Sequence, residues 1–360
     1  MTFIDLAVAA LVCALAAWLT WHLSRPASAL RLLDHPNERS LHQTPLPRTG
    51  GLAILVALGA GLLARWLISL STASEDVFTA TGWWTFLCCA LVALVSFWDD
   101  WAEVGSGVRF AVHLTASCCA VFGANLVVRE IDLPLIATTS TTISLGWLAA
   151  PLTVLWLVWM TNLYNFMDGM DGFAGGMSVC GFAFLSTLAW VSDHTALAVV
   201  AALTAAGAFG FLVFNFPPAR IFMGDVGSTV LGFLAGALAV WGVRDRAFAW
   251  PVPVLVFAPF IVDATVTLAR RLLRGERVWQ AHREHYYQRL VLAGWTHRRT
   301  ALAEYALMIF CGASAILYSK IERTDVRAAL LGLCVAVITG CALGVRRVEQ
   351  KRLRVDEIPV

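Results

Sequence analysis

The sequence predicts an all-α polytopic membrane protein with about eleven transmembrane helices. Hydrophobic residues make up 59% of the 360 residues and charged residues only 14%, against roughly 45–50% and about 25% in soluble globular proteins. Apolar stretches follow one another along the chain, and most approach the roughly 20 residues that cross a bilayer. This composition excludes a disordered chain, a coiled coil and an ordinary soluble enzyme.

Eleven stretches of the chain are candidate transmembrane helices. They are residues 4–24, 50–70, 82–97, 109–128, 146–164, 175–192, 196–214, 229–243, 251–269, 300–318 and 327–345. No repeat or linker separates them, so we expect a single domain over residues 1–360. The loop at 129–145 is rich in Thr, Ser and Ile, which favours a small hairpin. The nine cysteines lie within apolar stretches and form no CxxC pair, so we expect neither disulfides nor a zinc site.

The distribution of basic residues predicts the orientation. With the N-terminus outside and the helices alternating, 19 of the 26 Lys and Arg residues fall on the inner side and seven on the outer side. Cytoplasmic loops carry the excess of positive charge. We therefore expect the N-terminus outside, which would be periplasmic in a bacterial cytoplasmic (inner) membrane, and the C-terminus in the cytoplasm. No basic residue precedes the first apolar stretch, so it does not resemble a signal peptide.

Acidic, amide and histidine side chains concentrate on the predicted inner side. Five separate inner segments supply Asp34, Asn37, His42, Asp99, Asp100, Asn165, Asp168, Asp171, Asn215, Asp225, His282 and His285. Ionisable groups at a membrane are costly and usually functional. The sequence therefore predicts an active site on the cytoplasmic face.

The first two of these segments offer cations and an acidic pair. Residues 34–51 contain three prolines and two terminal glycines, which indicates an irregular loop in which Arg39, His42 and Arg48 are suited to binding anions. Asp99 and Asp100 end a predicted span, and adjacent carboxylates suit a proton acceptor or a neighbour of Mg²⁺. The plainer alternatives are a basic inner loop and a pair of solvated acids.

The third segment is a polar series directly after a span. Asn162, Asn165, Asp168 and Asp171 recur every three residues, so neighbouring members share one face of a helix or 3₁₀ turn. Two Asp-Gly steps allow a ligand to approach the backbone closely. A polar series at this place favours a functional role.

The fourth segment, FMGDVGST at 222–229, precedes another apolar helix. The N-terminal amides of that helix attract phosphate, and Gly224 and Gly227 permit close approach. Asp225 supplies a hard oxygen ligand where a Mg²⁺ ion bridging two phosphates would lie. No P-loop lysine is present, so the segment is not a P-loop.

The fifth segment is the long inner loop with HREHYYQRL at 282–290. His282, Arg283 and His285 are suited to a pyrophosphate, whereas HxxH lacks the Glu of a zinc-protease motif. Asp263 lies about two turns inside the preceding span, and we expect it to be a structural partner of Arg270 or of another inner cation.

Taken in order, the five segments resemble those of the polyprenyl-phosphate N-acetylhexosamine-1-phosphate transferase superfamily, over about residues 30–300. The superfamily includes the phospho-MurNAc-pentapeptide translocase and the GlcNAc-1-phosphate transferases. Two departures bear on the branch. Asp99-Asp100 is followed by Trp-Ala-Glu rather than by a nearby Lys, and His282-Arg-Glu-His285 replaces three consecutive histidines. The sequence therefore looks more like the O-antigen-initiating branch than like the translocase.

The resemblance implies a reaction. Undecaprenyl phosphate and a UDP-N-acetyl-sugar, carrying GlcNAc or a modified sugar such as FucNAc or QuiNAc, would give undecaprenyl-diphospho-sugar and UMP, as the first step of O-antigen or a similar polysaccharide. The implied cofactor is Mg²⁺, with Mn²⁺ as the alternative ion. The implied partners are these two substrates and the lipid bilayer, without nucleic acid, and a homodimer is allowed.

The resemblance also implies roles for individual residues. Asn165 and Asp225 would hold the metal. The catalytic group would be Asp99, Asp100 and Asp168, with Asp99 either the base for the lipid phosphate or a residue that positions Mg²⁺ or the lipid head group. The substrate-binding residues would be Arg48, Arg109, Asn162, Asp171, Asn215, His282, Arg283 and His285.

Two other classes of protein fit parts of the sequence. A secondary transporter also has ten or more helices, but its polar site lies near the bilayer midplane and often between repeated halves. Here the predicted midplane carries almost no charge, apart from His113, and no repeat is visible. A lipid-binding scaffold is the second alternative, and the complete set of Asp99, Asp168 and Asp225 argues against it.

Overall fold

The computed structural model describes residues 1–28, 30, 32–36, 41, 44–71, 79–102, 104–136, 139–277 and 282–356. Asn37, Arg39 and His42 of the predicted basic loop lie outside the described residues.

The chain is an all-α polytopic membrane protein. In its described part, ten helices are long and apolar enough to cross a membrane. They are α1 (Phe3–Leu23), α2 (Gly50–Ser71), α3 (Ala80–Ala102), α4 (Ser106–Cys118, continued by a π-helical turn Cys119–Gly123), α5 (Ala149–Met167, preceded by a 3₁₀ turn Gly146–Leu148), α6 (Phe173–Val191), α7 (Thr195–Asn215), α8 (Gly224–Arg244), α12 (His297–Lys320) and α13 (Thr324–Asp356). The fold class expected from the composition is confirmed.

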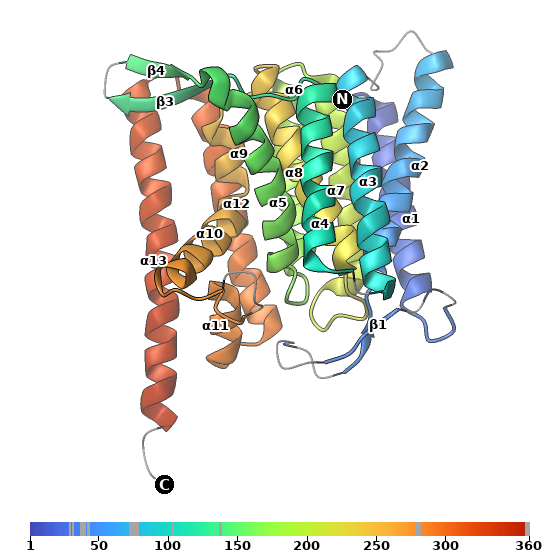
Figure 1. The fold of residues 1–360 in the computed structure, drawn as a ribbon, viewed down its shortest axis with the longest axis vertical. Helices are drawn as coiled ribbons and strands as arrows, with labels where there is room; N and C mark the ends of the chain where they lie inside the picture. Colours follow the sequence, from blue (N-terminus) through green and yellow to red (C-terminus); the bar gives the residue numbers. More distant parts are fainter. Residues whose placement is uncertain are drawn as a thin grey trace.

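The predicted span 251–269 is not one helix, which corrects the sequence-based expectation. It is broken into α9 (Pro251–Val256) and α10 (Ala258–Leu273). Pro259 lies in the first turn of α10, where proline removes a backbone donor and disfavours helical geometry in the residue before it. The chain therefore bends at Phe257, and α10 leaves the bundle obliquely toward α13 (Figure 1). The N-terminus and the last turns of α13 lie at opposite ends of the bundle (Figure 1).

Four short strands and one short helix complete the described structure. β1 (Leu33–Asp34) pairs antiparallel with β2 (Leu46–Pro47), and Leu33 lies opposite Pro47. β3 (Glu130–Ile136) and β4 (Thr139–Ser144) form an antiparallel hairpin, which confirms the hairpin predicted in the loop 129–145. The short helix is α11 (Tyr286–Leu292), between α10 and α12. The β3–β4 hairpin and β1 lie at opposite ends of the bundle (Figure 1).

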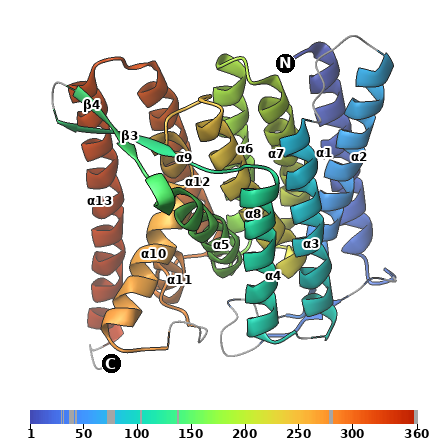
Figure 2. The ribbon, with the colours of Figure 1, turned by 45° about the horizontal axis from the view of Figure 1, so that its top comes forward.

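Helix α8 lies in the middle of the bundle, in contact with α3 and α5 (Figure 2). Every residue from Val226 to Gly242 is buried. Small residues allow this close packing: a Cβ at Gly232 would lie 2.6 Å from the carbonyl oxygen of Met160 on α5. Because α8 is held on all sides, its first turn has a fixed position at the end of the bundle.

Two buried charges join α1 and α2. The Arg65 Nε lies 2.7 Å from the Asp5 carboxylate, and both side chains are almost completely buried. The orientation count assigns Arg65 to the outer side, and the structure places it inside α2, within the predicted span 50–70.

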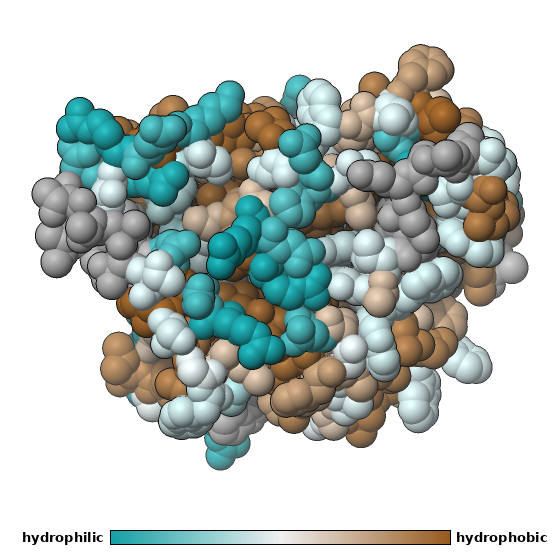
Figure 3. Space-filling model, turned by 90° about the horizontal axis from the view of Figure 1, so that it is seen from above, coloured by the Kyte–Doolittle hydropathy of each residue, from teal (hydrophilic) through white to brown (hydrophobic). Residues whose placement is uncertain are grey.

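Figure 3 looks onto the end of the bundle with the β3–β4 hairpin, where hydrophilic side chains gather in the middle and along one edge.

Candidate functional site

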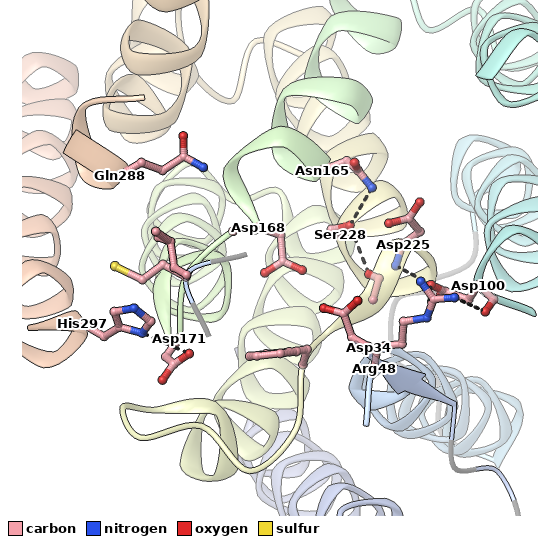
Figure 4. A pocket seen from close by; sticks show the side chains of 15 residues that line it. Asp34, Arg48, Asp100, Asn165, Asp168, Asp171, Asp225, Ser228, Gln288 and His297 are labelled. Carbon is pink, nitrogen blue, oxygen red and sulfur yellow. Dashed lines mark hydrogen bonds and ion pairs between the residues drawn. The ribbon is translucent and has the colours of Figure 1, made fainter. Parts of the chain in front are cut away.

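A polar pocket of about 230 Å³ opens at the end of the bundle that carries β1 (Figure 4). The ends of α3 and α5, the start of α8, the β1–β2 segment, α11 and α12 contribute to it. Its lining residues are Asp34, Leu41, Arg48, Asp100, Asn165, Asp168, Gly169, Met170, Asp171, Phe222, Gly224, Asp225, Ser228, Gln288 and His297. Five aspartates thus face one arginine and one histidine, so the pocket is suited to a cation.

The N-terminus of α8 forms one wall and is capped by a carboxylate from another helix. Asp100 accepts hydrogen bonds from the backbone N–H groups of Asp225 (3.2 Å) and Val226 (3.1 Å). A negative charge is stabilised at this end of a helix. Arg48 donates to the Asp100 carbonyl oxygen and its Nε lies 3.6 Å from the carboxylate. Asp100 therefore fixes the first turn of α8, which carries Asp225, and Arg48 contacts the same aspartate.

Gly224 is required by this arrangement. Its φ is +72°, and a Cβ there would lie 2.1 Å from the carbonyl oxygen of Arg48 and 3.0 Å from Asp100 Oδ2. The start of α2 is joined to the residues before α8 by two backbone hydrogen bonds, from the Gly50 N–H to the Phe222 carbonyl (2.9 Å) and from the Gly51 N–H to the Met223 carbonyl (2.8 Å).

We expect Gly224→Ala to lower both the melting temperature and the turnover. The left-handed conformation costs an L residue about 1–2 kcal/mol, and the close contact with Arg48 adds to that cost. Gly59→Ala on α2 is the matched control, because no atom lies within 4 Å of its added Cβ. Thermal melting of both purified variants checks this; equal melting temperatures would contradict the close packing.

Arg109 bridges two carboxylates beside the pocket. Its Nη1 donates to Asp99 Oδ2 (2.6 Å) and to Asp225 Oδ2 (3.0 Å). The other oxygen of Asp99 accepts from the backbone N–H of Val104 (2.7 Å). Asp99 does not line the pocket, and both of its oxygens are engaged. The Arg109 guanidinium thus connects the carboxylates of Asp99 and Asp225.

Asp168 points into the pocket directly after α5 (Figure 4). No described residue donates a hydrogen bond to its carboxyl group. Burial, together with the negative charges of Asp225, Asp100 and Asp34, raises the pKa of Asp168 to about 8. A carboxyl group in these surroundings gains most from a positive charge placed beside it.

Asn162 and Asn165, the first two members of the third polar segment, have different surroundings near the end of α5. Asn165 donates to Ser228 Oγ (3.2 Å) on α8 and lines the pocket. Asn162 donates instead to the carbonyl oxygen of Val158 and does not line it. The helix ends at Met167, so the spacing of three does not keep the series on one face.

Asp171 and Asn215 hold the loops on the far side of the pocket. Asp171 accepts from the Ala219 N–H (3.0 Å) and lies 3.2 Å from His297 Nδ1. Although burial acts to raise its pKa, these two partners outweigh it and leave the pKa of Asp171 below its usual value. Asn215 accepts from the Gly172 N–H (2.9 Å) and donates to the Ile221 carbonyl oxygen (2.9 Å). Asn215 is buried and fastens two loops rather than lining the pocket.

The three residues expected to grip a pyrophosphate do not line this pocket. His285 is buried at the start of α11, with its Nδ1 3.2 Å from Asp263. His282 packs against His285, with ring centroids 4.8 Å apart, and burial with the neighbouring charge of His285 lowers the pKa of His282 to about 4. Arg283 lines a different pocket. Asp263 also accepts from the Tyr286 N–H (3.0 Å), so its partner is the start of α11 rather than Arg270.

Two polar side chains of the lining are not expected from the sequence. Gln288 on α11 and His297 at the start of α12 lie beside the loop that follows α5, near Gly169 and Asp171 respectively. His297 follows the arginine-rich loop and begins a span, which was a usable signal. Nothing in the local sequence distinguishes Gln288.

The donor set fits a hard cation that keeps some of its water. No group of three or more His, Cys, Asp or Glu side chains forms a ready-made metal cage within the described ranges. Mg²⁺ does not require one, because it is usually held by one or two carboxylates, water and substrate phosphates. Asp225, Asp168 and the amide of Asn165 line the pocket and are the oxygen donors that would suit such an ion.

The chain is similar to a family of membrane transferases. The model of glycosyl transferase family 4 matches residues 83–243, from α3 to the end of α8. A Bacillus subtilis protein named "Probable undecaprenyl-phosphate N-acetylglucosaminyl 1-phosphate transferase" is 30% identical over 296 residues, which cover 82% of this chain and 79% of that protein.

Two further relatives show the range of names. The decaprenyl-phosphate N-acetylglucosaminephosphotransferase of Mycobacterium tuberculosis is 30% identical over 360 residues, covering 91% of this chain and 86% of the relative. The phospho-N-acetylmuramoyl-pentapeptide-transferase of Latilactobacillus sakei is 28% identical over 284 residues, covering 75% and 83%.

Proposed function

The chain belongs to glycosyl transferase family 4, and we propose that it transfers an N-acetylhexosamine-1-phosphate from a UDP-sugar to undecaprenyl phosphate. The products are undecaprenyl-diphospho-sugar and UMP. The Bacillus subtilis and Mycobacterium tuberculosis relatives carry both a polyprenyl phosphate and N-acetylglucosamine in their names, which favours GlcNAc or a modified form of it. We propose the start of O-antigen or a similar surface polysaccharide as its place in the cell.

The observation that carries this proposal is the acidic pocket at the start of α8. One substrate is a lipid and the other is water-soluble, so the site has to lie at the end of the bundle. The transfer forms a bond from a lipid-phosphate oxygen to the phosphorus next to the sugar and breaks the bond from that phosphorus to UMP. Mg²⁺, when bound, would neutralise the charge on the two phosphates.

The lipid phosphate is itself the nucleophile. The residues of the chain therefore position the two substrates and neutralise the charge of their phosphates. Asp225 and Asn165 would hold the metal, with Asp168 beside them. Arg109 keeps Asp225 in place through its second contact to Asp99. Asp171 and His297 form the opposite wall, where we place the nucleotide.

Release of UMP tests the reaction directly. Purified protein should release UMP from UDP-GlcNAc only when undecaprenyl phosphate and Mg²⁺ are both present. A panel of UDP-sugars under the same conditions identifies the donor. A transporter or a scaffold would give no UMP with any of them.

The affinity for Mg²⁺ is expected to rise with pH and to level off above about pH 8. Asp168 is protonated below its pKa of about 8 in the metal-free protein. Cation binding beside it releases that proton, so the affinity increases by up to about tenfold per pH unit below this value. Calorimetric titration at several pH values measures this, and Asp168→Asn should weaken the dependence, most of all near pH 8. An affinity independent of pH in the wild type would exclude Asp168 from the cation site.

We further propose that the pocket faces the cytoplasm, in the inner membrane. A reporter that fluoresces only in the cytoplasm should be active after Val360. The same reporter inserted at 321–323, between α12 and α13, is the matched control and should be inactive. The opposite pattern would reverse the orientation and separate the site from cytoplasmic UDP-sugars.

A further inference from the structure

A second pocket, of about 300 Å³, lies between α10, α12 and α13. Its walls are chiefly apolar, with Val262 and Val266 from α10, Leu307 from α12, and Ile338 and Leu343 from α13. α10, which supplies one wall, runs obliquely toward α13 (Figure 1). None of its lining residues lines the Asp225 pocket.

Arginines surround one end of this apolar pocket. Arg270 and Arg346 line both it and an adjoining pocket of about 480 Å³. The adjoining pocket is also lined by Arg274, Arg283, Arg289, Glu284 and Glu349. Five arginines and two glutamates leave this pocket with an excess of three positive charges. An excess of this size at a membrane boundary favours an anionic ligand.

The two carboxylates are already used. Glu284 pairs with Arg274, and Glu349 accepts two hydrogen bonds from Arg289. Arg270 packs over the Tyr286 ring at 4.9 Å and contacts its hydroxyl group. Within the ranges that the structure describes, neither Arg270 nor the exposed Arg346 has an acidic partner. These two cations stand where the apolar and the basic pockets meet.

Two acidic side chains lie on the wall of the apolar pocket. Asp263 is occupied by His285 and by the Tyr286 N–H. Glu304 lies about two turns inside α12 and disfavours an anion at that depth. A ligand that carries both a phosphate and apolar chains would therefore place its phosphate at the arginines and its chain along the apolar wall.

We propose that this surface binds an anionic phospholipid of the bilayer, with its phosphate between Arg270 and Arg346 and an acyl chain between α10, α12 and α13. Arginine pairs with phosphate through charge-assisted hydrogen bonds, and basic pockets between helices bind such head groups. The proposed site is distinct from the Asp225 pocket, since the two pockets have no lining residue in common.

Native mass spectrometry of the full chain in mixed phosphatidylglycerol and phosphatidylcholine tests the proposal. We expect selective retention of phosphatidylglycerol, reduced about tenfold in Arg346→Gln and in Arg270→Gln. Arg347→Gln is the matched control, since it removes the same charge from the next residue of α13, which lines neither pocket. Arg346→Gln decides the matter if Arg270→Gln fails to fold, because Arg270 also contacts Tyr286.

A competition experiment shows which phosphate-bearing ligand occupies the site. Undecaprenyl phosphate and inorganic phosphate, each added at the concentration of phosphatidylglycerol, should leave the bound phospholipid in place. Displacement by undecaprenyl phosphate would make this a substrate-lipid site, and displacement by inorganic phosphate would make it a soluble-anion site. Either result overturns the proposal, as would an equal loss in Arg347→Gln.

Discussion

Asp225→Asn is expected to reduce sugar-1-phosphate transfer by about 10³-fold or more while the protein still folds. Asp225 lies in the first turn of α8, and its carboxylate lines the pocket 3.0 Å from Arg109 Nη1. Asparagine keeps the shape of the side chain and removes only its charge. Loss of a charged metal ligand removes about 4 kcal/mol of transition-state stabilisation, which corresponds to that factor.

UMP release by purified enzyme at saturating substrates measures this effect. Asp193→Asn is the matched control, because Asp193 has φ of 60°, which asparagine tolerates, and lies at the other end of α6 from the Asp225 pocket. The control should have normal turnover, and both variants should melt like the wild type. Near-normal turnover of Asp225→Asn, or full wild-type activity in EDTA, would remove the metal role.

Asp99→Asn is expected to cause a loss of turnover that is constant between about pH 6.5 and 9. Both oxygens of Asp99 are engaged, one by Val104 and the other by Arg109, which also holds Asp225. The variant therefore disturbs the position of Asp225, and higher Mg²⁺ concentration should restore part of the activity. A phosphate monoester has a second pKa of about 6 and needs little help to ionise.

A general base would behave differently. General-base assistance is typically worth about 10²–10⁴-fold, and the defect would shrink as the lipid phosphate loses its proton without help. A pH–rate profile of Asp99→Asn against wild type, at saturating lipid, separates the two roles. Recovery of the variant at high pH would assign the proton transfer to Asp99.

The helices could be predicted because their signal is local. A stretch of about 20 apolar residues is sufficient to indicate a span, and ten long helices appear where such stretches occur. The broken helix at 251–273 differs because one residue, Pro259, overrides the apolar pattern. The proline was visible in the sequence, whereas the direction in which α10 leaves the bundle depends on its packing.

The site could be predicted only in part, because contact between distant segments is not local. Asp100, Asn165, Asp168 and Asp225 come together in one pocket. Asn215 shows the limit: its amide holds two loops together, and the motif alone does not distinguish such a residue from one that faces a ligand.

The same limit applies to the last inner loop. His285 was expected at a pyrophosphate, and its side chain is instead buried against Asp263. A histidine pair in sequence gives no information on which side chains the short helix α11 turns inward. Gln288, one turn further on, is the α11 residue that lines the pocket.

The ion pair between Asp5 and Arg65 has a consequence for how the protein is made. Arg65 lies inside α2, where it pairs with Asp5 of α1, and Asp5 also accepts hydrogen bonds from Thr2 at the start of its own helix. A charge at the centre of a spanning helix costs about 2.5–3.5 kcal/mol by insertion scales, so α2 is expected to insert more easily together with α1 than alone. The two helices should leave the translocon as a hairpin, and a nascent chain that has lost one partner should be the form that cellular quality control recognises.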